Sequence, residues 1–521
     1  MIEIVKKYLL LNNFSQSLND FEDVFLSHPN YPSIFAITDT LNMLSIENIA
    51  LKVPKEQFEE LPNFFLAIYN DNLTLTIKNI SNVTIETENG KNKVLNYNEF
   101  LSGWNDVIIV IEPNANLVLK KEKINLKWLF YTLPVFALIL LSVVFNHHTI
   151  NSTILLIISL TGLLISVFII QEKLGIKNEI ASKFCSINTN ISCNSVIKSE
   201  KSEINQWIGF TDLPLLFFSI SVLAIIIQPE QIYIIIGLIS LASTPVIIYS
   251  LWLQKFKLKK WCVLCLAVSV IILIQSLVFS FAITLINISK ISIFSFLLST
   301  ILLVTIWLLV KPILESKIKI EKEVIDFKKF KRNFEVFNFM SKDIPLINGF
   351  NQLEGLQFGN LLSPVKLTII ISPSCGHCHK AFKDGLDLVK KFPERVSLHV
   401  LFNINPENID NPYKLVVETL LAISFINPEN AESAISDWHI KKMELKNWLE
   451  NWNVKTNNMK VNHEIHQQYQ WCLENNFNYT PVKIVNGKLI PNEYEINELK
   501  YFLNNFSEMK QENYLLEKVL M

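Results

Sequence analysis

The stretch Trp261-Cys262-Val263-Leu264-Cys265 places a Cys-x-x-Cys dithiol at the start of an apolar run that continues to about Asn287. A helix needs about 20 predominantly apolar residues to cross a bilayer. The dithiol is therefore expected at the mouth of a membrane span. This is an unusual place for a soluble thiol motif, and it predicts redox chemistry coupled to the membrane.

Two further cysteine pairs lie on either side of this motif. Cys185 and Cys193 occupy a polar loop upstream, Cys375 and Cys378 occupy a soluble region downstream, and Cys472 is left over. Frameworks of structural disulfides are typical of short secreted chains, so pairs on a membrane scaffold indicate working thiols. Three dithiols along one chain predict an electron relay. The lone Cys472 is predicted to be a small core residue, with a regulatory thiol as the alternative.

The composition indicates a membrane protein of several domains. The chain has 521 residues, of which 50% are hydrophobic and 18% charged, and its mean hydropathy is +0.30. That length allows two to four domains. A net charge of −1 gives no reason to expect a nucleic-acid partner. The start, Met1-Ile2-Glu3-Ile4, lacks a basic region followed by an apolar one, so no cleavable signal peptide is expected.

Six apolar runs predict an α-helical membrane domain over residues 126–310. They cover about residues 126–145, 152–171, 213–228, 232–253, 262–287 and 291–310. Most approach the length of a membrane-spanning helix. An even number of spans places both termini, the 172–212 loop and Cys262 on one side of the membrane. All three dithiols can then meet, as a relay requires.

The cysteines of this domain resemble those of the vitamin K epoxide reductase family. The matching residues are Cys185 and Cys193, Val196-Ile197 with Ser199, Ile208-Gly209-Phe210 with Leu213-Pro214, and Cys262 with Cys265. The resemblance covers about residues 152–287 and implies a four-helix redox core with a quinone, menaquinone or ubiquinone, held near Cys265. It also implies that one loop cysteine meets the partner and the other passes electrons to the Cys-x-x-Cys. Ser269 stands where animal members carry a tyrosine.

Two structural interpretations compete with the relay at these residues. Either cysteine pair alone would serve as a disulfide that ties down a loop. Cys185, Cys193, Cys262 and Cys265 would also supply four thiolates to zinc. The loose spacing of the loop pair and the lack of a nearby His or Asp ligand disfavour zinc, and we predict no metal.

A charged, helix-forming linker over residues 311–340 leads to a soluble domain expected over 341–510. An apolar strand at 365–372 is followed by a turn and by Cys375-Gly376-His377-Cys378 at a helix start, and the segment around Thr480-Pro481 precedes a hairpin. This order resembles the disulfide-oxidoreductase branch of the thioredoxin-like proteins over about 345–505. The resemblance implies a cis peptide bond at Thr480-Pro481, facing the bound partner.

The expected position of the motif on its helix predicts different roles for its two thiols. Cys375 lies at the helix N-terminus, where N–H groups and the dipole stabilise a thiolate. His377 adds positive charge or a hydrogen bond, which lowers the Cys375 pKa further. A stabilised thiolate favours an oxidising disulfide. Cys378, one turn inward, is the expected resolving thiol, and His379 is expected at the surface.

Residues 1–118 are predicted to form an α+β domain. A helix is expected at 33–44 and strands at 64–69, 73–77, 83–86 and 107–111. The segments from Leu41 through Glu59-Glu60-Leu61-Pro62 to Trp104 resemble the cysteine peptidase domain of double-glycine peptide exporters. No cysteine precedes Cys185, so the nucleophile is missing. We expect an inactive, peptidase-like module that binds a peptide or packs against the rest of the chain.

These features predict a membrane thiol:quinone oxidoreductase that carries its own thioredoxin-like partner. Exported protein thiols would reduce Cys375–Cys378, and electrons would pass through Cys185–Cys193 and Cys262 to Cys265 and then to quinone. One rival is the reverse reaction, a quinol-driven disulfide reductase. The other is a non-enzymatic peptide-export accessory with structural cysteines.

The side of the membrane on which this chemistry occurs has two opposing indicators. Lysines crowd the loops next to the cysteines, at positions 120, 121, 123, 127, 173, 177, 183, 255, 257, 259 and 260, whereas the opposite loops hold only Lys290. The positive-inside rule places such loops in the cytoplasm. Disulfide formation requires an oxidising compartment. We expect a multi-pass protein of the bacterial inner membrane with periplasmic soluble domains, with the cytoplasmic orientation as the alternative.

Overall fold

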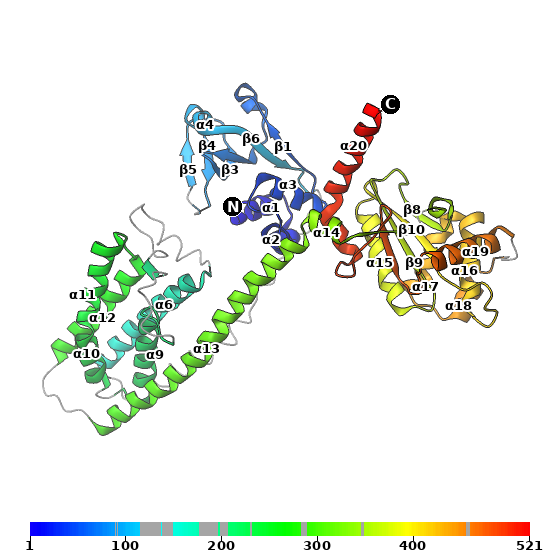
Figure 1. Cartoon of the computed structure of the whole chain (residues 1–521). Coiled ribbons are helices and arrows are strands. Elements are labelled where there is room, and N and C mark those ends of the chain that lie inside the picture. Colours follow the sequence, from blue (N-terminus) through cyan, green and yellow to red (C-terminus); the bar gives the residue numbers. More distant parts are fainter. Residues whose placement is uncertain are drawn as a thin grey trace. The chain divides into compact units, whose positions relative to one another are not determined.

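The computed structural model describes residues 1–88, 90, 92–114, 137, 149–176, 196–197, 207–229, 232–282, 289–344, 348–454 and 459–520 (Figure 1). The loop cysteines Cys185 and Cys193, Ser199 and the expected span at 126–145 lie outside these ranges. The predictions made for them stay predictions.

The N-terminal residues form helices followed by an antiparallel sheet. The helices are α1 (Ile2–Leu11), α2 (Leu18–Leu26) and α3 (Ile34–Met43), and the strands are β1 (Asn48–Lys52), β2 (Phe64–Tyr69), β3 (Asn72–Lys78), β4 (Val83–Glu86), β5 (Asn92–Leu95) and β6 (Trp104–Ile111). The sheet order is β1-β6-β2-β3-β4-β5. Ser33 caps α3 by accepting a hydrogen bond from the N–H of Ala36. The expected helix and strands are confirmed, and the peptidase-like character stays a prediction.

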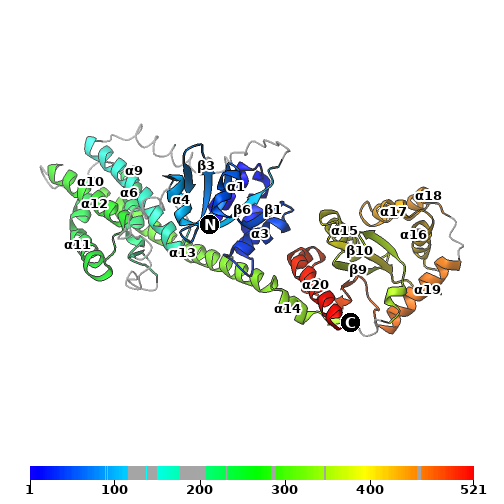
Figure 2. The same ribbon diagram turned by 90° about the horizontal axis from the view of Figure 1, so that it is seen from above.

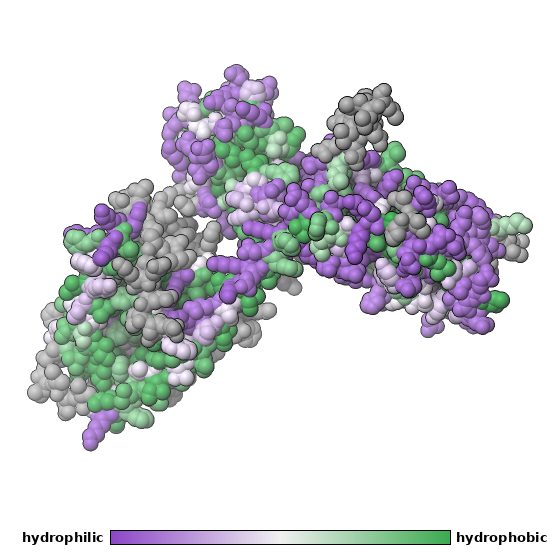
Figure 3. All heavy atoms as spheres, in the orientation of Figure 1, coloured by the Kyte–Doolittle hydropathy of each residue, from purple (hydrophilic) through white to green (hydrophobic). Residues whose placement is uncertain are grey.

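The apolar runs form helices long enough to cross a membrane. The described ones are α6 (Ile150–Leu174), α9 (Asp212–Ile227), α10 (Ile232–Ala242), α11 (Thr244–Trp252), α12 (Val263–Ala282) and α13 (Lys290–Lys331). In the described part of the chain, four helical segments are long and apolar enough to span a membrane, at residues 150–174, 232–258, 263–280 and 290–331. Helix α9 is apolar too but shorter than these segments. Apolar side chains dominate the visible surface of this region (Figure 3). The chain is a membrane protein, and the number of six spans stays a prediction.

The membrane helices pack through small residues and a buried polar network. Helix α6 packs against α9 and α12, and α10 packs against α12. Gly162 of α6 gives room to the Phe218 ring of α9, because a Cβ atom there would lie 2.5 Å from that ring. Buried Gln275 of α12 donates to Ser159 of α6 at 2.9 Å and accepts from Ser240 of α10 at 3.2 Å. Buried polar side chains in a membrane need such partners, so the network fixes how these three helices align.

Helix α13 is continuous across the boundary expected at residue 310. Its first part is apolar, Pro312 lies within it, and its second part carries the exposed ion pairs Lys317–Glu321 and Lys319–Glu323. Such i,i+4 pairs stabilise a solvated helix by a few tenths of a kcal/mol each. The helix-forming linker expected after residue 310 therefore continues α13 as far as Lys331.

The C-terminal domain has a six-stranded sheet in the order β7-β12-β11-β9-β10-β8. The strands are β7 (Lys342–Asp343), β8 (Leu356–Gly359), β9 (Val365–Ile371), β10 (Val396–Phe402), β11 (Val482–Val485) and β12 (Lys488–Leu489). Strands β9 and β10 are parallel and joined through α15 (Gly376–Lys391), while β11 and β12 form an antiparallel hairpin. This is the thioredoxin-like arrangement that the sequence predicts.

Helices cover both faces of this sheet. Helix α15 packs against the core that contains Leu367, Ile369 and Ile371 of β9, whereas α19 (Met459–Glu474) packs against Ile370 (Figures 1 and 2). A helical insertion between β10 and β11 comprises α16 (Lys414–Ile426), α17 (Ala431–His439) and α18 (Leu445–Asn451) together with α19, and α20 (Leu503–Leu520) ends the described chain. The indole of Trp438 donates to the carbonyl of Pro373 at 3.0 Å. The insertion thereby supports the turn that precedes Cys375.

Candidate redox site

Cys375 and Cys378 lie at the start of α15, where the sequence places them. Cys375 is the N-cap residue, and its Sγ accepts a hydrogen bond from the N–H of Cys378 at 3.3 Å. Cys375 is partly exposed and Cys378 is fully buried, and both are free thiols. A partner sulfur can reach Cys375 but cannot reach Cys378.

The two thiols differ in acidity for physical reasons. Burial raises the pKa of Cys375, but hydrogen bonds from Cys378, Thr480 and the backbone N–H of His377 outweigh it and leave the pKa below its ordinary value. Burial, with the neighbouring Cys375 sulfur, raises the pKa of Cys378 to about 12. The His377 ring is exposed, and it is the backbone N–H of this residue that helps to lower the Cys375 pKa. Cys375 is therefore the nucleophile and the better leaving group.

We expect the alkylation rate of Cys375 to titrate at lower pH than that of an ordinary cysteine. Its thiolate is stabilised in the fold, so this stabilisation is complete above the unfolded pKa of about 8.5 and is lost as the pH falls through the folded pKa. Cys378 stays a thiol at neutral pH. The reduced chain is alkylated with iodoacetamide at several pH values between 5 and 10. Peptide mapping then gives the alkylation rate of Cys375 and that of Cys378 separately. The urea-unfolded chain is the control, and a folded Cys375 that titrates at or above 8.5 contradicts the assignment.

A cis peptide bond joins Thr480 to Pro481, as the resemblance implies. As a thiol, Cys375 lies 3.4 Å from the carbonyl of Thr480 and donates to it. Tyr479, beside this bond, is exposed. Thr480 and Pro481 therefore lie directly against the reactive sulfur, and their contact with a bound partner stays a prediction.

A histidine pair lies beside the buried thiol, and the sequence did not indicate it. The Nδ1 atoms of His379 and His439 are 2.9 Å apart, which requires that one ring donates and the other accepts. Burial lowers the pKa of His379, and it lowers that of His439 to about 3. His379 is only partly buried, so it lies at the surface as expected, and its ring also contacts His439 of α17. The two residues are 60 positions apart, and no local pattern connects them.

Cys262 and Cys265 repeat this cap geometry at the start of α12. The N–H of Cys265 donates to Sγ of Cys262 at 3.3 Å, and the N–H of Cys262 donates to the side chain of Gln254 at 2.9 Å. Gln254 belongs to a π-helical turn, Leu253–Leu258, after which Lys259 has a positive φ of 50°. This fold-back brings Gln254 to the cysteine and buries Cys262 completely.

An apolar cavity of about 560 Å³ lies next to Cys265. Cys265 lines it, whereas Cys262 does not. Its other lining residues include Phe210, Thr211, Phe217, Tyr249, Ser250, Val268, Ser269, Phe296 and Thr300. The Ser269 hydroxyl donates to the carbonyl of Cys265 at 2.9 Å. The hydroxyl of Thr211 is buried with no hydrogen-bond partner in the described part of the chain. The cavity thus offers apolar walls, a thiol and an unused hydrogen-bonding group.

The sequence did not single out Tyr249, whose ring packs edge-on against Phe210 at 6.4 Å between centroids. Both residues line the cavity, from α11 and from the segment before α9. Tyr249 lay within an apolar run in which periodicity marks only burial. The residue type alone could have drawn attention to Tyr249, because amphipathic aromatic residues are typical of membrane interfaces.

Buried Asp212 anchors the segment that closes this cavity. It accepts a hydrogen bond from the N–H of Gly209 at 2.8 Å, lies 2.7 Å from Nζ of Lys311 and 3.6 Å from Nζ of Lys173. Lys311 also donates to the carbonyl of Trp207 at 3.0 Å. These contacts join the ends of α6 and α9 to α13, so the residues at the start of α9 are held in place.

Replacing Lys311 with Met is expected to destabilise the membrane helices by about 3 kcal/mol, because it takes the nearer of two ammonium groups from buried Asp212 and leaves only Lys173, at 3.6 Å. Thermal unfolding of the purified chain in detergent measures this loss. The matched control on the same helix is Lys317→Met, which removes an exposed pair worth about 0.3–0.5 kcal/mol. Equal unfolding temperatures for the two variants contradict the anchoring role.

Comparison with known proteins relates part of the membrane region to a family. The vitamin K epoxide reductase family model matches residues 153–281. No curated protein matches the sequence. Part of the chain is similar to the catalytic domain of Proteus mirabilis ScsC, at 11% identity over 31% of this chain and 96% of that one, with a TM-score of 0.27.

Two other solved structures are also similar to about a third of this chain. The thiol-disulfide exchange protein alpha-DsbA2 from Wolbachia pipientis has 18% identity over 30% of this chain and 92% of that one, with a TM-score of 0.27. Oxidised BdbD from Bacillus subtilis has 15% identity over 32% of this chain and 96% of that one, with a TM-score of 0.25.

A region that matches the vitamin K epoxide reductase family model and a capped, asymmetric dithiol on a thioredoxin-like domain together support a thiol–disulfide redox role. Its chemistry at Cys375 is nucleophilic exchange with a disulfide, since a stabilised thiolate lies beside a buried thiol. The membrane dithiol has the same local geometry and faces an apolar cavity.

Proposed function

We propose that the chain is a membrane thiol:quinone oxidoreductase that reoxidises its own thioredoxin-like domain and so drives disulfide formation in exported proteins. The observation that carries the proposal is that Cys265 lines an apolar cavity and Cys262 does not. Cavities of about 300–1,000 Å³ with few polar groups are typical of small-molecule sites. The residues fit a quinone, menaquinone or ubiquinone, with the unpartnered Thr211 hydroxyl available to one carbonyl oxygen.

The relay moves two electrons and two protons. A substrate dithiol reduces the Cys375–Cys378 disulfide, and the resulting dithiol reduces Cys185–Cys193 through a mixed disulfide. The Cys193 thiolate then attacks the Cys262–Cys265 disulfide at Cys262, and Cys185 resolves this mixed disulfide, so the loop disulfide re-forms and Cys262 and Cys265 become thiols. This dithiol passes two electrons and two protons to quinone and becomes a disulfide again, leaving quinol. The net change is one substrate disulfide and one quinol, with the two thiol protons ending on the quinol oxygens.

The direction follows from relative potentials. Respiratory quinones lie above typical dithiol couples, so electrons run downhill from thiols to quinone. The lowered Cys375 pKa supports this direction, because a stabilised thiolate makes its disulfide easier to reduce by substrate. The purified chain should therefore oxidise a reduced peptide dithiol with loss of quinone absorbance. A chain that oxidises quinol and reduces a peptide disulfide instead would establish the reverse reaction.

The oxidising reaction places the soluble domains in the periplasm and the chain in the bacterial inner membrane. Lysine-rich loops favour the opposite orientation, so the side needs direct measurement. A membrane-impermeant maleimide should label Cys375 in intact spheroplasts, while Cys378 stays unlabelled because it is buried. Labelling only after lysis would place the chemistry in the cytoplasm.

The N-terminal domain is proposed to bind or present a peptide without cleaving it. Residues 1–114 contain no cysteine, and so no peptidase nucleophile of the expected kind. Incubating the full chain with a double-glycine leader peptide should leave the peptide intact. Cleavage would assign a different catalytic residue and a different role.

A further inference from the structure

One face of the C-terminal sheet differs in character between its two halves. Toward the end of β9, Ile370 is buried with Leu401 of β10 beneath Trp471 of α19. Toward its start, β9 presents Lys366 and Thr368 on the same face. Their neighbours in register are polar as well, with Ser397 and His399 on β10, Gln357 on β8 and Asn486 beside β11. A sheet of this type is normally covered by apolar packing on both faces.

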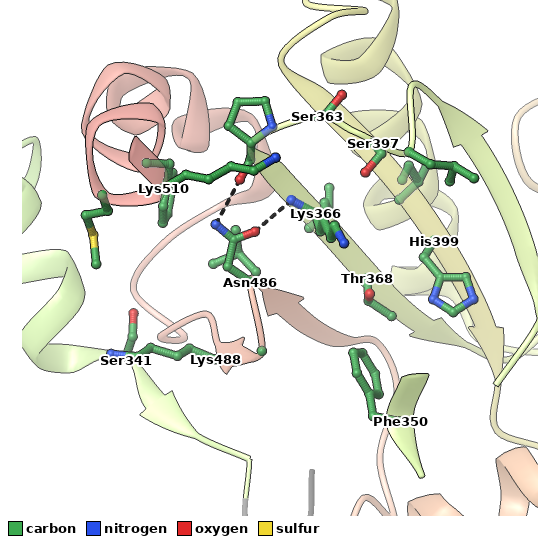
Figure 4. A pocket seen from close by; sticks show the side chains of 18 of the residues that line it. Ser341, Phe350, Ser363, Lys366, Thr368, Ser397, His399, Asn486, Lys488 and Lys510 are labelled. Carbon is green, nitrogen blue, oxygen red and sulfur yellow. Dashed lines mark hydrogen bonds between the residues drawn. The ribbon is translucent and has the colours of Figure 1, made fainter. Parts of the chain in front are cut away.

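These polar residues line a groove of about 770 Å³ (Figure 4). In the close-up, Lys366, Thr368, Ser397 and His399 lie together on the sheet, and Lys510 reaches across from α20. Phe337, Phe350 and Phe506 add apolar surface to the walls. Cys375 and Cys378 do not line this groove. Helix α15, which carries them, packs on the other face of β9.

The charge of the groove is positive. Lys366, Lys488 and Lys510 line it, and no Asp or Glu does so within the described chain. Lys488 donates to the side-chain oxygen of Asn338 at 3.1 Å, and Lys510 donates to the carbonyl of Leu362 at 2.8 Å. Both of these acceptors are neutral, so hydrogen bonding positions the ammonium groups without cancelling their charge.

The floor of the groove is ordered by its own hydrogen bonds. The Asn486 side chain accepts from the N–H of Lys366 at 2.8 Å and donates to the carbonyl of Pro364 at 3.1 Å. Nε2 of His399 donates to the carbonyl of Glu354 at 3.0 Å. A positively charged groove with a fixed polar floor is complementary to an anion and loses little entropy when it binds one.

We propose that this groove binds an extended, acidic segment of a partner protein. The floor crosses β8, β10, β9 and β11, and three strand spacings of about 4.8 Å make roughly 14 Å, the length of about four extended residues. Side chains of an extended peptide alternate in direction, so carboxylates two residues apart can face the lysines. The site needs no thiol of the partner and is therefore independent of the redox activity.

The test uses the full chain in phosphatidylcholine nanodiscs and a fluorescein-labelled hexapeptide of alternating glutamate and leucine, which lacks cysteine. Fluorescence anisotropy should show binding that weakens with salt, because ion pairs are screened. Lys366→Glu and Lys488→Glu should each weaken binding by about tenfold or more, since like charges repel at the site. Lys446→Glu on exposed α18 makes the same charge change outside the groove and should leave binding unchanged.

Three results would overturn the proposal. The first is equal binding of a lysine–leucine peptide, and the second is equal binding by the Lys366→Glu and Lys446→Glu variants. The third is loss of peptide binding in millimolar inorganic phosphate at constant ionic strength, or on adding phosphatidylglycerol to the nanodiscs. That result would assign the groove to a small anion or to a lipid headgroup.

Discussion

Replacing Cys265 with alanine should abolish quinone reduction while Cys375 continues to exchange with substrate thiols. Cys265 is the cysteine that lines the apolar cavity, so its loss removes the thiol that reacts with quinone. Loss of a reacting group typically lowers a rate by three orders of magnitude or more, so we expect about a 10³-fold drop. Anaerobic quinone absorbance with a dithiol donor measures it.

A matched control for this variant is Ser269→Ala. Ser269 lines the same cavity and donates only to the carbonyl of Cys265, so its loss should change the rate by a few-fold at most. Wild-type quinone reduction by Cys265→Ala would make the membrane dithiol structural. The loop cysteines give a second readout, because Cys265→Ala should accumulate a Cys193–Cys262 bond that peptide mapping detects.

The complementary variant separates the two membrane thiols. With Cys262→Ala, the Cys265 thiolate keeps its place at the cavity and should give a long-wavelength charge-transfer absorption with quinone. Cys265→Ala should give none, because Cys262 lies outside the cavity lining. The reverse pattern would exchange the two assignments.

Replacing Cys378 with alanine should trap the soluble domain on the membrane domain. Cys375 keeps its stabilised thiolate and attacks a disulfide, but no buried thiol remains to resolve the mixed disulfide. We expect nearly all chains to carry a Cys375–Cys185 bond, compared with almost none in the parent. Non-reducing peptide mapping identifies the bond. A bond from Cys375 to Cys262 would reverse the order of the relay.

Cys472→Ala is the matched control for trapping. Cys472 is also buried, and burial raises its pKa to about 12, but it packs on α19 away from the motif. It should trap nothing. Trapping by both variants would mean that loosening the domain, rather than losing the resolving thiol, exposes Cys375.

Much of the fold could be predicted because local pattern and structure agree. The run Val365–Ile371 is a buried strand, and the residue after its turn is the N-cap Cys375. Both follow from spacing within about ten residues. The apolar runs likewise became helices, because in lipid a helix is how a single segment satisfies its own backbone.

The features that the sequence did not indicate depend on residues far apart in the chain. Asp212 and Lys311 are 99 positions apart and meet only when α9 packs beside α13. Phe210 and Tyr249 become a cavity wall only after the helices assemble. The helix-forming character of the segment after residue 310 could be predicted, because its charged residues favour helix as the apolar ones before them do.

The number of quinones that one reduced chain consumes tests the relay most directly. Chains reduced and desalted under anaerobic conditions, in nanodiscs, are titrated with quinone while quinol is measured and remaining thiols are alkylated and mapped. A working relay should yield three quinols per chain, with the pairs Cys185–Cys193, Cys262–Cys265 and Cys375–Cys378 all oxidised at the end. Consumption that stops at one quinol, with Cys375 and Cys378 still open to alkylation after unfolding, would contradict it.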